Sequence, residues 1–282
     1  QNLRPTKKNL RLASFTFDTM NYALITGASS GMGRCYANEM ASRGYNIIAV
    51  SNQAEQLDTV AKEIIETYKV AVNTICIDLA DTTSAKEIYD ITLENGWIVD
   101  VLICNAGILL FSTLLRTEPE KLITINNLHC TTNTLLCRYF GQEMKERGKG
   151  HILIMSSSTA WLPYPTISHY AATKAYLHSF AQSLWYEMRG RGVSVTAVYP
   201  SAVDTPFYDL SDKMRRRLLS CGVMMSAESV VRKALKAMFH SRRRCLPGVV
   251  TKLEAAICAV LPSWALLPVM KLPAVRKILD RV

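Results

Sequence analysis

Several features are absent from the 282-residue sequence. No apolar run approaches the roughly 20 residues that a membrane-spanning helix needs. Residues 1–20 carry four basic side chains but no apolar segment of the kind found in secretory signals. No internal repeat or low-complexity linker occurs. With 49% hydrophobic and 20% charged residues, the composition excludes a disordered chain and is sufficient for one large α/β domain.

The eight cysteines form neither a CxxC motif nor a Cys/His cluster with metal-ligand spacing, so we predict no metal site and no disulfide framework. Several lie in apolar runs, such as Cys76 in VNTICIDLA and Cys104 in VLICNAG. We therefore predict buried, reduced thiols, which are typical of a reducing compartment. We therefore expect a cytoplasmic protein. If it binds a membrane, we expect it to do so as a peripheral protein.

Acidic residues are scarce in the C-terminal quarter. From Lys213 onward there are 15 Lys and Arg against three Asp and Glu, whereas residues 1–212 hold 18 against 20. One interpretation is a solvated helix face; the other is a patch for an anionic substrate, an acidic partner or an anionic membrane. Because no aromatic stacking platform or recognised binding motif accompanies the charge, we expect no nucleic-acid partner.

Apolar runs of strand length alternate with helical patterns over most of the chain. The predicted strands are residues 22–26, 46–50, 71–77, 99–104, 151–156 and 193–199. Near-continuous apolar strands joined by helices are typical of a parallel sheet covered on both faces. Right-handed crossovers then predict a Rossmann-type, doubly wound α/β fold in three layers, with a nucleotide crevice at the carboxyl ends of the strands.

The chain divides into three parts by composition. We predict an N-terminal extension over residues 1–20, a single Rossmann-fold domain over 21–246, and an apolar, basic, Pro-punctuated extension over 247–282. The last part could form amphipathic helices packed over the substrate cleft, a subunit contact or a membrane-surface segment. Packing against the body of the protein is the default interpretation.

A glycine-rich turn, TGASSGMG from Thr26 to Gly33, follows the first predicted strand and opens a helix. Glycine allows backbone N–H groups to approach a diphosphate, and the N-terminus of a helix adds favourable partial charge. The position of the turn between a strand and a helix therefore predicts a dinucleotide site.

Tyr170 and Lys174 lie four residues apart in HYAATKAY. On a helix they share one face, whereas Tyr176 points elsewhere. A phenol with a pKa near 10 is a poor base at neutral pH, and a nearby ammonium lowers that pKa. The spacing is thus compatible with a catalytic acid and the group that tunes it, although a packed pair by chance would have the same spacing.

With these motifs the chain resembles the short-chain dehydrogenase/reductase family. Further matches follow the family's order over about residues 21–240: DLAD from Asp78, NAG at 105–107 and YPSAVDT at 199–205, each after a predicted strand. The stretch GKGHILIMSSSTAWLPYPTISHYAATKA looks most similar to the hydroxysteroid and long-chain 3-ketoacyl reductase branch.

The resemblance implies roles for individual residues. Tyr170 is the expected acid/base, Lys174 its tuner and a ribose ligand, and Ser157, thirteen residues before the tyrosine, orients the substrate oxygen. The expected cofactor-binding residues, besides Tyr170 and Lys174, are Gly27, Ser29, Ser30, Gly31, Met32, Gly33, Asn52, Asp78, Leu79, Asn105, Ala106, Gly107, Pro200, Val203 and Thr205.

One position departs from the family pattern. The family usually has an asparagine that helps to hold a water in a proton relay behind the lysine, and this chain has His129 there. Asn126 and Asn127 lie nearby but would need compensating gaps on both sides. His129 keeps the backbone carbonyl and could add a titratable ring to the catalytic set. A tolerated packing residue is the alternative.

The end of the second strand bears on the cofactor. It reads AVSNQ and lacks the carboxylate that bonds the adenosine ribose in NAD(H)-binding members of such folds. Arg34 follows the glycine loop, but we expect it to point along its helix. NADP(H) is therefore the expected cofactor, with NAD(H) possible.

The resemblance implies an oxidoreductase that interconverts a hydrophobic ketone and its secondary alcohol, such as a steroid, 3-oxoacyl or lipid-like carbonyl compound, as a homodimer or homotetramer. A substrate lid is expected at about 206–225, and its basic residues would suit an anionic handle such as coenzyme A. Apolar side chains are expected on the substrate side at Trp161, Leu162, Tyr164, Phe207, Tyr208, Leu210, Met214, Met224 and Met225. The rival interpretation is a catalytically silent, nucleotide-binding, membrane-peripheral protein.

Overall fold

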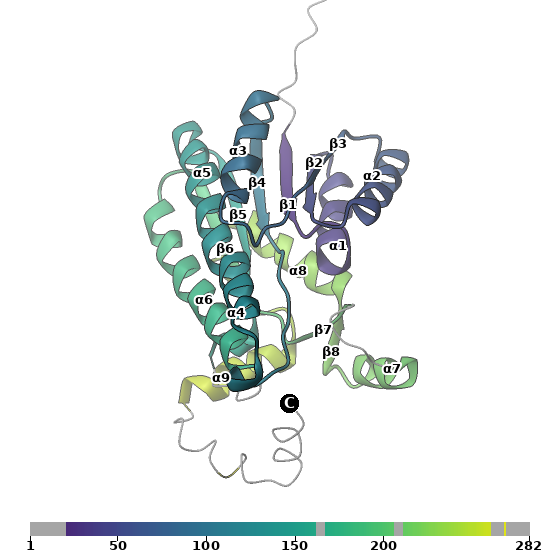
Figure 1. Ribbon diagram of the computed structural model, residues 1–282, viewed down its shortest axis with the longest axis vertical. Coiled ribbons are helices and arrows are strands. Elements are labelled where there is room, and N and C mark those ends of the chain that lie inside the picture. Colours follow the sequence, from purple (N-terminus) through teal and green to yellow (C-terminus); the bar gives the residue numbers. More distant parts are fainter. Residues whose placement is uncertain (1–20, 162–166, 206–210, 261–267, 269–282) are drawn as a thin grey trace, which may run out of the picture.

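A parallel seven-stranded sheet forms the centre of the protein (Figure 1). The computed structural model describes residues 21–161, 167–205, 211–260 and 268. The sheet order is β3-β2-β1-β4-β5-β6-β9, so the order reverses between β1 and β4. Such a switch point opens a crevice at the carboxyl ends of the strands. The strands of this sheet are β1 (Tyr22–Thr26), β2 (Asn46–Ser51), β3 (Val72–Cys76), β4 (Val99–Cys104), β5 (Gly150–Met155), β6 (Val193–Val198) and β9 (Arg244–Cys245).

Helices cover both faces of the sheet, which gives three layers (Figure 1). One face packs against α1, α2 and α8, and the other against α3, α5 and α6. The α-helices are α1 (Gly31–Ala41), α2 (Ala54–Tyr68), α3 (Ser84–Glu94), α4 (Pro119–Asn126), α5 (Thr132–Arg147), α6 (Ser168–Met188), α7 (Asp212–Ser220), α8 (Ala227–Phe239) and α9 (Val249–Val260). Short helical segments are η1 (Leu114–Arg116), the π-helix η2 (Asn127–Thr131) and η3 (Ser158–Ala160).

The central strand shows why apolar runs produce this sheet. Ala23 and Ile25 point into the core beneath α1, α2 and α8, while Tyr22 and Leu24 point into the core on the other side. Successive side chains in a strand face opposite ways, so a strand buried on both faces is apolar at nearly every position, and in β1 the exception is Thr26. The predicted doubly wound α/β fold is thereby confirmed.

Three parts of the chain differ from the sequence-based expectation. Between β4 and β5 the sequence has a helical pattern over 117–147, which would be one long helix, but the structure divides it into α4, the π-helix η2 and α5. Residues beyond β6 add β9 to the sheet edge, and β7 (Ala202–Asp204) pairs in parallel with β8 (Met224–Ser226) in a small separate sheet. Cys104 is buried as expected, but Cys76 is exposed because β3 is an edge strand.

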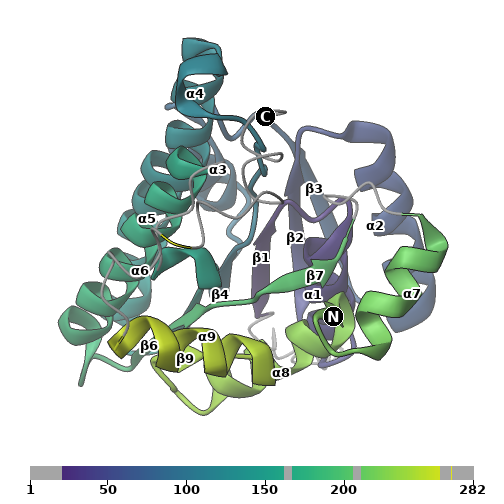
Figure 2. The ribbon, with the colours of Figure 1, turned by 90° about the horizontal axis from the view of Figure 1, so that it is seen from below.

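The elements after the strands gather at one end of the protein. Figure 2, which views that end, shows α4, α7 and α9 around it. Helix α9 packs against η3, next to the end of β5. Among the described residues, no helix is both long and apolar enough to cross a bilayer. The N-terminal extension over 1–20, residues 206–210 of the expected lid, and most of the tail after residue 260 lie outside the described residues.

Candidate active site

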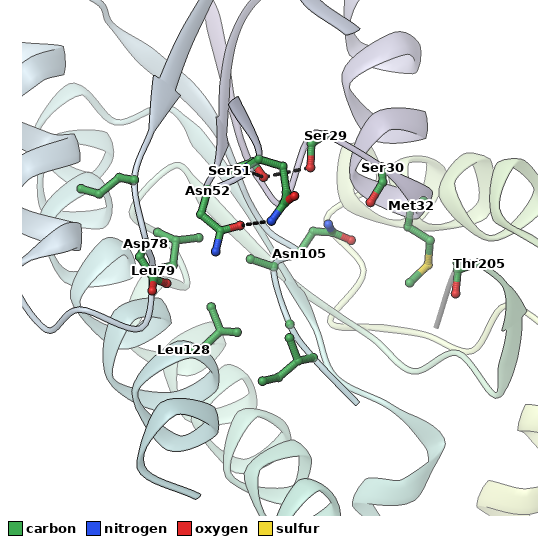
Figure 3. Close-up of a pocket in the computed structure, with 17 residues that line it drawn as sticks. Ser29, Ser30, Met32, Ser51, Asn52, Asp78, Leu79, Asn105, Leu128 and Thr205 are labelled. Carbon is green, nitrogen blue, oxygen red and sulfur yellow. Dashed lines mark hydrogen bonds between the residues drawn. The ribbon is translucent and has the colours of Figure 1, made fainter. Parts of the chain in front are cut away.

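A cavity of about 280 Å³ lies at the carboxyl ends of β1, β2, β3 and β4 (Figure 3). Ser51, Gln53, Ile77, Ile108 and Leu128 line it although they were not predicted as cofactor ligands. The predicted cofactor residues that line it are Gly27, Ser29, Ser30, Gly31, Met32, Asn52, Asp78, Leu79, Asn105, Ala106, Gly107 and Thr205. The spacing of the motifs therefore located this cavity, because each motif follows a parallel strand and all such ends meet at one edge of the sheet.

The glycine loop gives this cavity the properties of a diphosphate site. A Cβ atom on Gly33 would lie 1.8 Å from the carbonyl oxygen of Gly27, so only glycine fits where α1 meets the loop. Gly33 itself lines neither cavity and acts through this packing. Ser30 precedes α1, and within the described part of the chain its side chain does not cap the helix. The N–H groups of the first turn, with the favourable end of the helix dipole, are thus available to an anion, and these residues fit a dinucleotide.

Thr26 joins the glycine loop to the NAG motif. Its fully buried hydroxyl accepts hydrogen bonds from the backbone N–H groups of Asn105 (2.9 Å) and Ala106 (3.0 Å). The Asn105 side chain donates back to the Thr26 carbonyl oxygen at 3.0 Å. Thr26 was predicted only as the first residue of the glycine-rich turn, and its position at the end of the first strand is the sequence feature that indicates this further role.

The end of the cavity at β2 carries neutral polar groups. The Ser29 and Ser51 hydroxyl oxygens lie 2.8 Å apart, and Gln53 donates to the Asn52 side-chain oxygen at 3.2 Å (Figure 3). Arg34, expected to point along its own helix, instead pairs with Glu63 of the neighbouring helix α2 at 2.6 Å, with both side chains nearly half exposed. Asp78 is the one charged residue among the described residues that line the cavity.

A second cavity, of about 330 Å³, adjoins the first and contains the predicted reaction centre. Ser157, Tyr170, Lys174 and His129 all line it, together with Pro200 and Val203. Met32, Asn105, Gly107, Ile108 and Thr205 line both cavities. All the predicted site residues apart from Gly33 therefore surround one continuous pair of cavities, although their chemical roles stay predictions.

Lys174 is fixed in a buried position beside Tyr170. Its Nζ atom donates to the Met155 carbonyl oxygen at 3.0 Å and lies 5.5 Å from the centre of the Tyr170 ring. The Ser156 hydroxyl donates a hydrogen bond of 2.8 Å to the Lys174 carbonyl oxygen, and this bond connects α6 to the end of β5. Burial lowers the pKa of Lys174 from 10.5 to about 8. The ammonium is thus close enough to Tyr170 to favour its phenolate form.

His129 is fully buried, and both of its ring nitrogens have protein partners. Nε2 accepts the Ile108 backbone N–H at 3.1 Å, so Nδ1 carries the proton and donates to Thr173 Oγ1 at 2.8 Å. The Thr173 hydroxyl in turn donates to the Tyr170 carbonyl oxygen at 2.8 Å. Burial, and then the charge of Lys174, hold the pKa of His129 well below 6.5, so the ring is neutral at pH 7.

The π-helix η2 directs residue 129 into the site. His129 lies in the middle of it, and its carbonyl oxygen accepts a hydrogen bond from the Asn133 side chain at 2.8 Å. Asn127 instead donates to the Ala80 carbonyl at 3.1 Å, and Asn126 is exposed. The histidine, and neither neighbouring asparagine, therefore occupies the expected position. Single-turn π-helices are frequent at functional sites.

The apolar wall of the second cavity differs from the prediction. Trp161 packs on Tyr199, with ring centres 4.7 Å apart, and Met214 is half exposed on α7. Neither these two nor Met224 and Met225 are among the described residues that line the cavity. The apolar lining includes Ile108, Leu109, Phe111 and Ile167, together with Met32, Met155, Pro200, Ala202 and Val203. Leu162, Tyr164, Phe207, Tyr208 and Leu210 lie outside the described residues.

Comparisons with known proteins agree with this geometry. Residues 21–216 match a family model described as short chain dehydrogenase. The chain is 33% identical over 253 residues to the very-long-chain 3-oxoacyl-CoA reductase of Bos taurus, a match that covers 86% of this chain and 76% of that protein. It is 35% identical over 199 residues to the inactive hydroxysteroid dehydrogenase-like protein 1 of Homo sapiens, covering 69% of this chain and 59% of the relative. A solved short-chain dehydrogenase from Sphingobium yanoikuyae in complex with NADPH is 26% identical, with a TM-score of 0.74 over 85% of this chain and 93% of that one.

Proposed function

We propose, on the premise that this chain belongs to the short-chain dehydrogenase family, that it interconverts a hydrophobic ketone and its secondary alcohol with NADP(H). The observation that carries the proposal is the position of Ser157, Tyr170 and Lys174 on one cavity that is continuous with a dinucleotide cavity. The substrate classes named in the relatives, 3-oxoacyl-CoA and hydroxysteroid, support a large apolar carbonyl compound.

The three side chains divide the work at the carbonyl oxygen. The nicotinamide cofactor supplies or accepts the hydride when bound. Tyr170 donates its phenolic proton to the substrate oxygen during reduction and takes it back during oxidation. Lys174, held by the Met155 carbonyl, stabilises the phenolate by its charge. Ser157, which already accepts the Thr159 backbone N–H at 3.2 Å, orients the substrate oxygen with its own hydroxyl proton.

The preference for NADP(H) rests on the neutral groups at the end of β2. A carboxylate there would repel a 2′-phosphate, and Ser51, Asn52 and Gln53 provide hydrogen-bonding groups without that repulsion. The NADPH complex of the Sphingobium structure is consistent with this preference.

The decisive experiment follows NADPH absorbance with a panel of steroid ketones and 3-oxoacyl thioesters. Tyr170→Phe should lower kcat by about 10²–10⁴, because the proton donor is lost, and should leave NADPH binding within about twofold of the wild type. Tyr176→Phe is the matched control on the same helix: Tyr176 is 42% exposed and bonds Thr134 outside the cavity, so its removal should leave kcat unchanged. Undiminished turnover by Tyr170→Phe would refute the proposed chemistry.

The second candidate is a silent nucleotide-binding protein, which the relative named as inactive favours. It predicts NADPH binding without turnover of any ketone in the panel. Both candidates allow the expected homodimer or homotetramer, which stays a prediction.

A further inference from the structure

Helix α9 has its polar and apolar sides reversed relative to an ordinary surface helix. Thr251 is fully buried and Glu254 is partly buried against the body of the protein. Val249, Leu253 and Ile257 are 74%, 58% and 52% exposed. An amphipathic helix normally buries its apolar side. The inner face of α9 therefore places polar groups inside the protein where packing alone would favour aliphatic ones.

Glu254 lines the reaction cavity and has one buried carboxylate oxygen without a hydrogen-bond partner among the described residues. Its Oε1 atom accepts the Ser201 hydroxyl at 3.2 Å. Its Oε2 atom is buried and has no hydrogen-bond partner among the described residues, and the same holds for the hydroxyl oxygen of Thr159. Glu254, Ser201 and Thr159 all line the cavity that contains Ser157 and Tyr170.

The chemistry of these atoms defines what would bind them. A buried polar atom without a partner destabilises the folded protein, so a ligand group that satisfies it binds favourably. An ionised carboxylate only accepts hydrogen bonds, whereas a threonine hydroxyl both donates and accepts. A ligand hydroxyl has the chemistry to satisfy either atom once that side chain turns toward the cavity, because it can donate to the carboxylate and its oxygen can accept from the threonine. The carboxylate charge at the same wall disfavours a ligand phosphate or carboxylate.

We propose that Glu254, Ser201 and Thr159 form a specificity subsite that binds a hydroxyl group of the substrate, away from the carbonyl that reacts. The proposal rests on the proposed function and narrows it to a neutral hydroxyketone. The α9 wall of the cavity then selects against a substrate whose anionic handle would lie there.

The test uses a rigid polycyclic ketone that carries one distant hydroxyl, and the same ketone without it. Wild-type kcat/KM should favour the hydroxyketone at least about tenfold, because a site built to bond a hydroxyl rejects the analogue that lacks one. In Glu254→Leu the ratio of the two kcat/KM values should fall to about one, mainly because kcat/KM for the hydroxyketone decreases. Glu254→Gln should keep part of the preference for the hydroxyketone. Ala256→Ser, at an exposed position of the same helix, should keep the wild-type ratio. Glu254→Leu should also raise the melting temperature, since it removes an unsatisfied buried oxygen.

Equilibrium binding of the same pair in the presence of NADPH separates the subsite from the proposed function. If neither ketone turns over but binding still favours the hydroxyketone through Glu254, the subsite stands and the proposed function fails. If both ketones turn over with a ratio near one in wild type and Glu254→Leu alike, a bound water satisfies Oε2 and the subsite is refuted while the function stands. Failure of both ketones to bind overturns the subsite.

The outer face of α9 carries a second, independent feature. Val249, Leu253 and Ile257 recur at four-residue spacing and form one exposed apolar stripe. Next to it lies a hollow that also contains Val249. The cationic side chains that line this hollow are Lys233, Lys236, Arg242, Arg244 and Lys252. All five are exposed, no acidic residue is among the described lining, and none of the five takes part in an ion pair between described residues.

We infer that this α9 face docks on an anionic lipid surface. An apolar stripe beside cations that form no ion pair with a described residue is the combination that inserts between acyl chains and attracts negative headgroups. A second copy of the chain would present the same positive charge and be repelled. Docking through the outer face would also bring a lipophilic substrate to the helix whose inner face lines the reaction cavity.

Sedimentation with phosphatidylcholine vesicles, with and without about 30% phosphatidylserine, tests the docking. The full chain should pellet with the anionic vesicles at low salt and be released as salt rises. Leu253→Ser with Ile257→Ser, and separately Lys233→Glu with Lys252→Glu, should each weaken binding at least about tenfold. Lys86→Glu with Lys62→Glu, distant from α9, is the matched charge control and should bind like the wild type. Equal binding to neutral vesicles, no binding to either, or a concentration-dependent dimer abolished by the serine substitutions would overturn the inference.

Discussion

The Nδ1 atom of His129 lies 2.8 Å from the hydroxyl oxygen of Thr173, and this contact links the π-helix to the helix that carries Tyr170 and Lys174. The Thr173 hydroxyl in turn donates a hydrogen bond to the Tyr170 carbonyl oxygen. On the opposite side of the ring, Nε2 accepts a hydrogen bond from the Ile108 backbone N–H. A histidine with both nitrogens engaged and a depressed pKa has no free proton to relay near neutral pH. We therefore interpret His129 as a positioning residue that fixes the backbone around the reaction centre.

His129→Phe keeps a ring but removes both hydrogen bonds. It should lower the free energy of unfolding by about 2–4 kcal/mol, because the Ile108 N–H and the Thr173 hydroxyl lose their buried partner. It should lower kcat without deleting a limb of the pH–rate profile. Thr173→Val, which breaks the same link but leaves the ring neutral, should behave similarly. Disappearance of a pKa from the kcat profile in His129→Phe alone would instead identify a titrating relay.

The pH dependence of unfolding gives an independent check on His129. Because its folded pKa lies well below 6.5, the unfolded chain binds a proton that the folded chain does not as pH falls through 6.5. Stability due to His129 is therefore present above pH 6.5 and is lost below it, with a slope of up to about 1.4 kcal/mol per pH unit. His151 and His178, whose pKa values burial also lowers, contribute in the same direction. In His129→Phe the slope measured by denaturant unfolding between pH 6.5 and 5 should become shallower.

The strands were predictable because they depend on short-range patterns, whereas the reaction centre was inferred from the resemblance of several such patterns to a known family. A strand buried on two faces, such as β1, is apolar at nearly every position, and the family resemblance places Ser157, Tyr170 and Lys174 around β5 and α6 by their spacing. The elements that could not be predicted from the sequence are those that form only through contacts with distant parts of the chain. β9 has two residues and becomes a strand only because β6 offers its edge.

The substrate wall illustrates the same limit. Trp161 is adjacent to the reaction centre in sequence, but its ring packs on Tyr199 beside His178. Glu254, about a hundred residues away from Ser157, reaches the cavity because α9 packs on η3. The π-helix at His129 could likewise not be predicted, because none of the residue types in its sequence NLHCT favours a π-helix over an α-helix.

Lys174→Met should abolish turnover and yet stabilise the protein without cofactor at pH 7. The fall in pKa from 10.5 to about 8 corresponds to a cost of about 3 kcal/mol for the buried ammonium. The lost bond to the Met155 carbonyl offsets about 1 kcal/mol, so a net gain of about 2 kcal/mol is expected.

The pH dependence of that gain distinguishes charge burial from better packing. Between pH 8 and 10.5 the unfolded chain binds more protons than the folded one, so wild-type stability rises with pH in that window. The advantage of Lys174→Met should therefore be largest below pH 8 and shrink toward pH 10.5 in denaturant titrations. Lys86→Met, at an exposed helix pair, should stay within about 0.5 kcal/mol of the wild type at every pH. A gain that is constant with pH would contradict the assigned cause.

Gly107→Ala should weaken both cofactor binding and turnover. A Cβ atom there would lie 2.9 Å from His129 Nε2, and that ring cannot retreat because both nitrogens are held. The clash must displace either the NAG loop, which lines both cavities, or His129. We expect NADPH affinity to fall about tenfold or more and kcat to fall as well. Gly141→Ala meets only the flexible ends of Met188 and Ile152 and should be nearly neutral in the same titration.

Asn52→Asp should reverse or abolish the preference for NADP(H). The two side chains have the same shape, so the change adds only a negative charge next to Ser51 at the end of β2 (Figure 3). That charge repels a 2′-phosphate and bonds the ribose hydroxyls of NAD(H). The ratio of kcat/KM for NADPH over NADH should therefore fall at least about tenfold, mainly through KM for NADPH. Asn52→Ala, which removes the amide without adding charge, should move the ratio much less. An unchanged ratio in Asn52→Asp would show that the adenosine phosphate does not lie beside β2 and would remove the basis for assigning NADP(H).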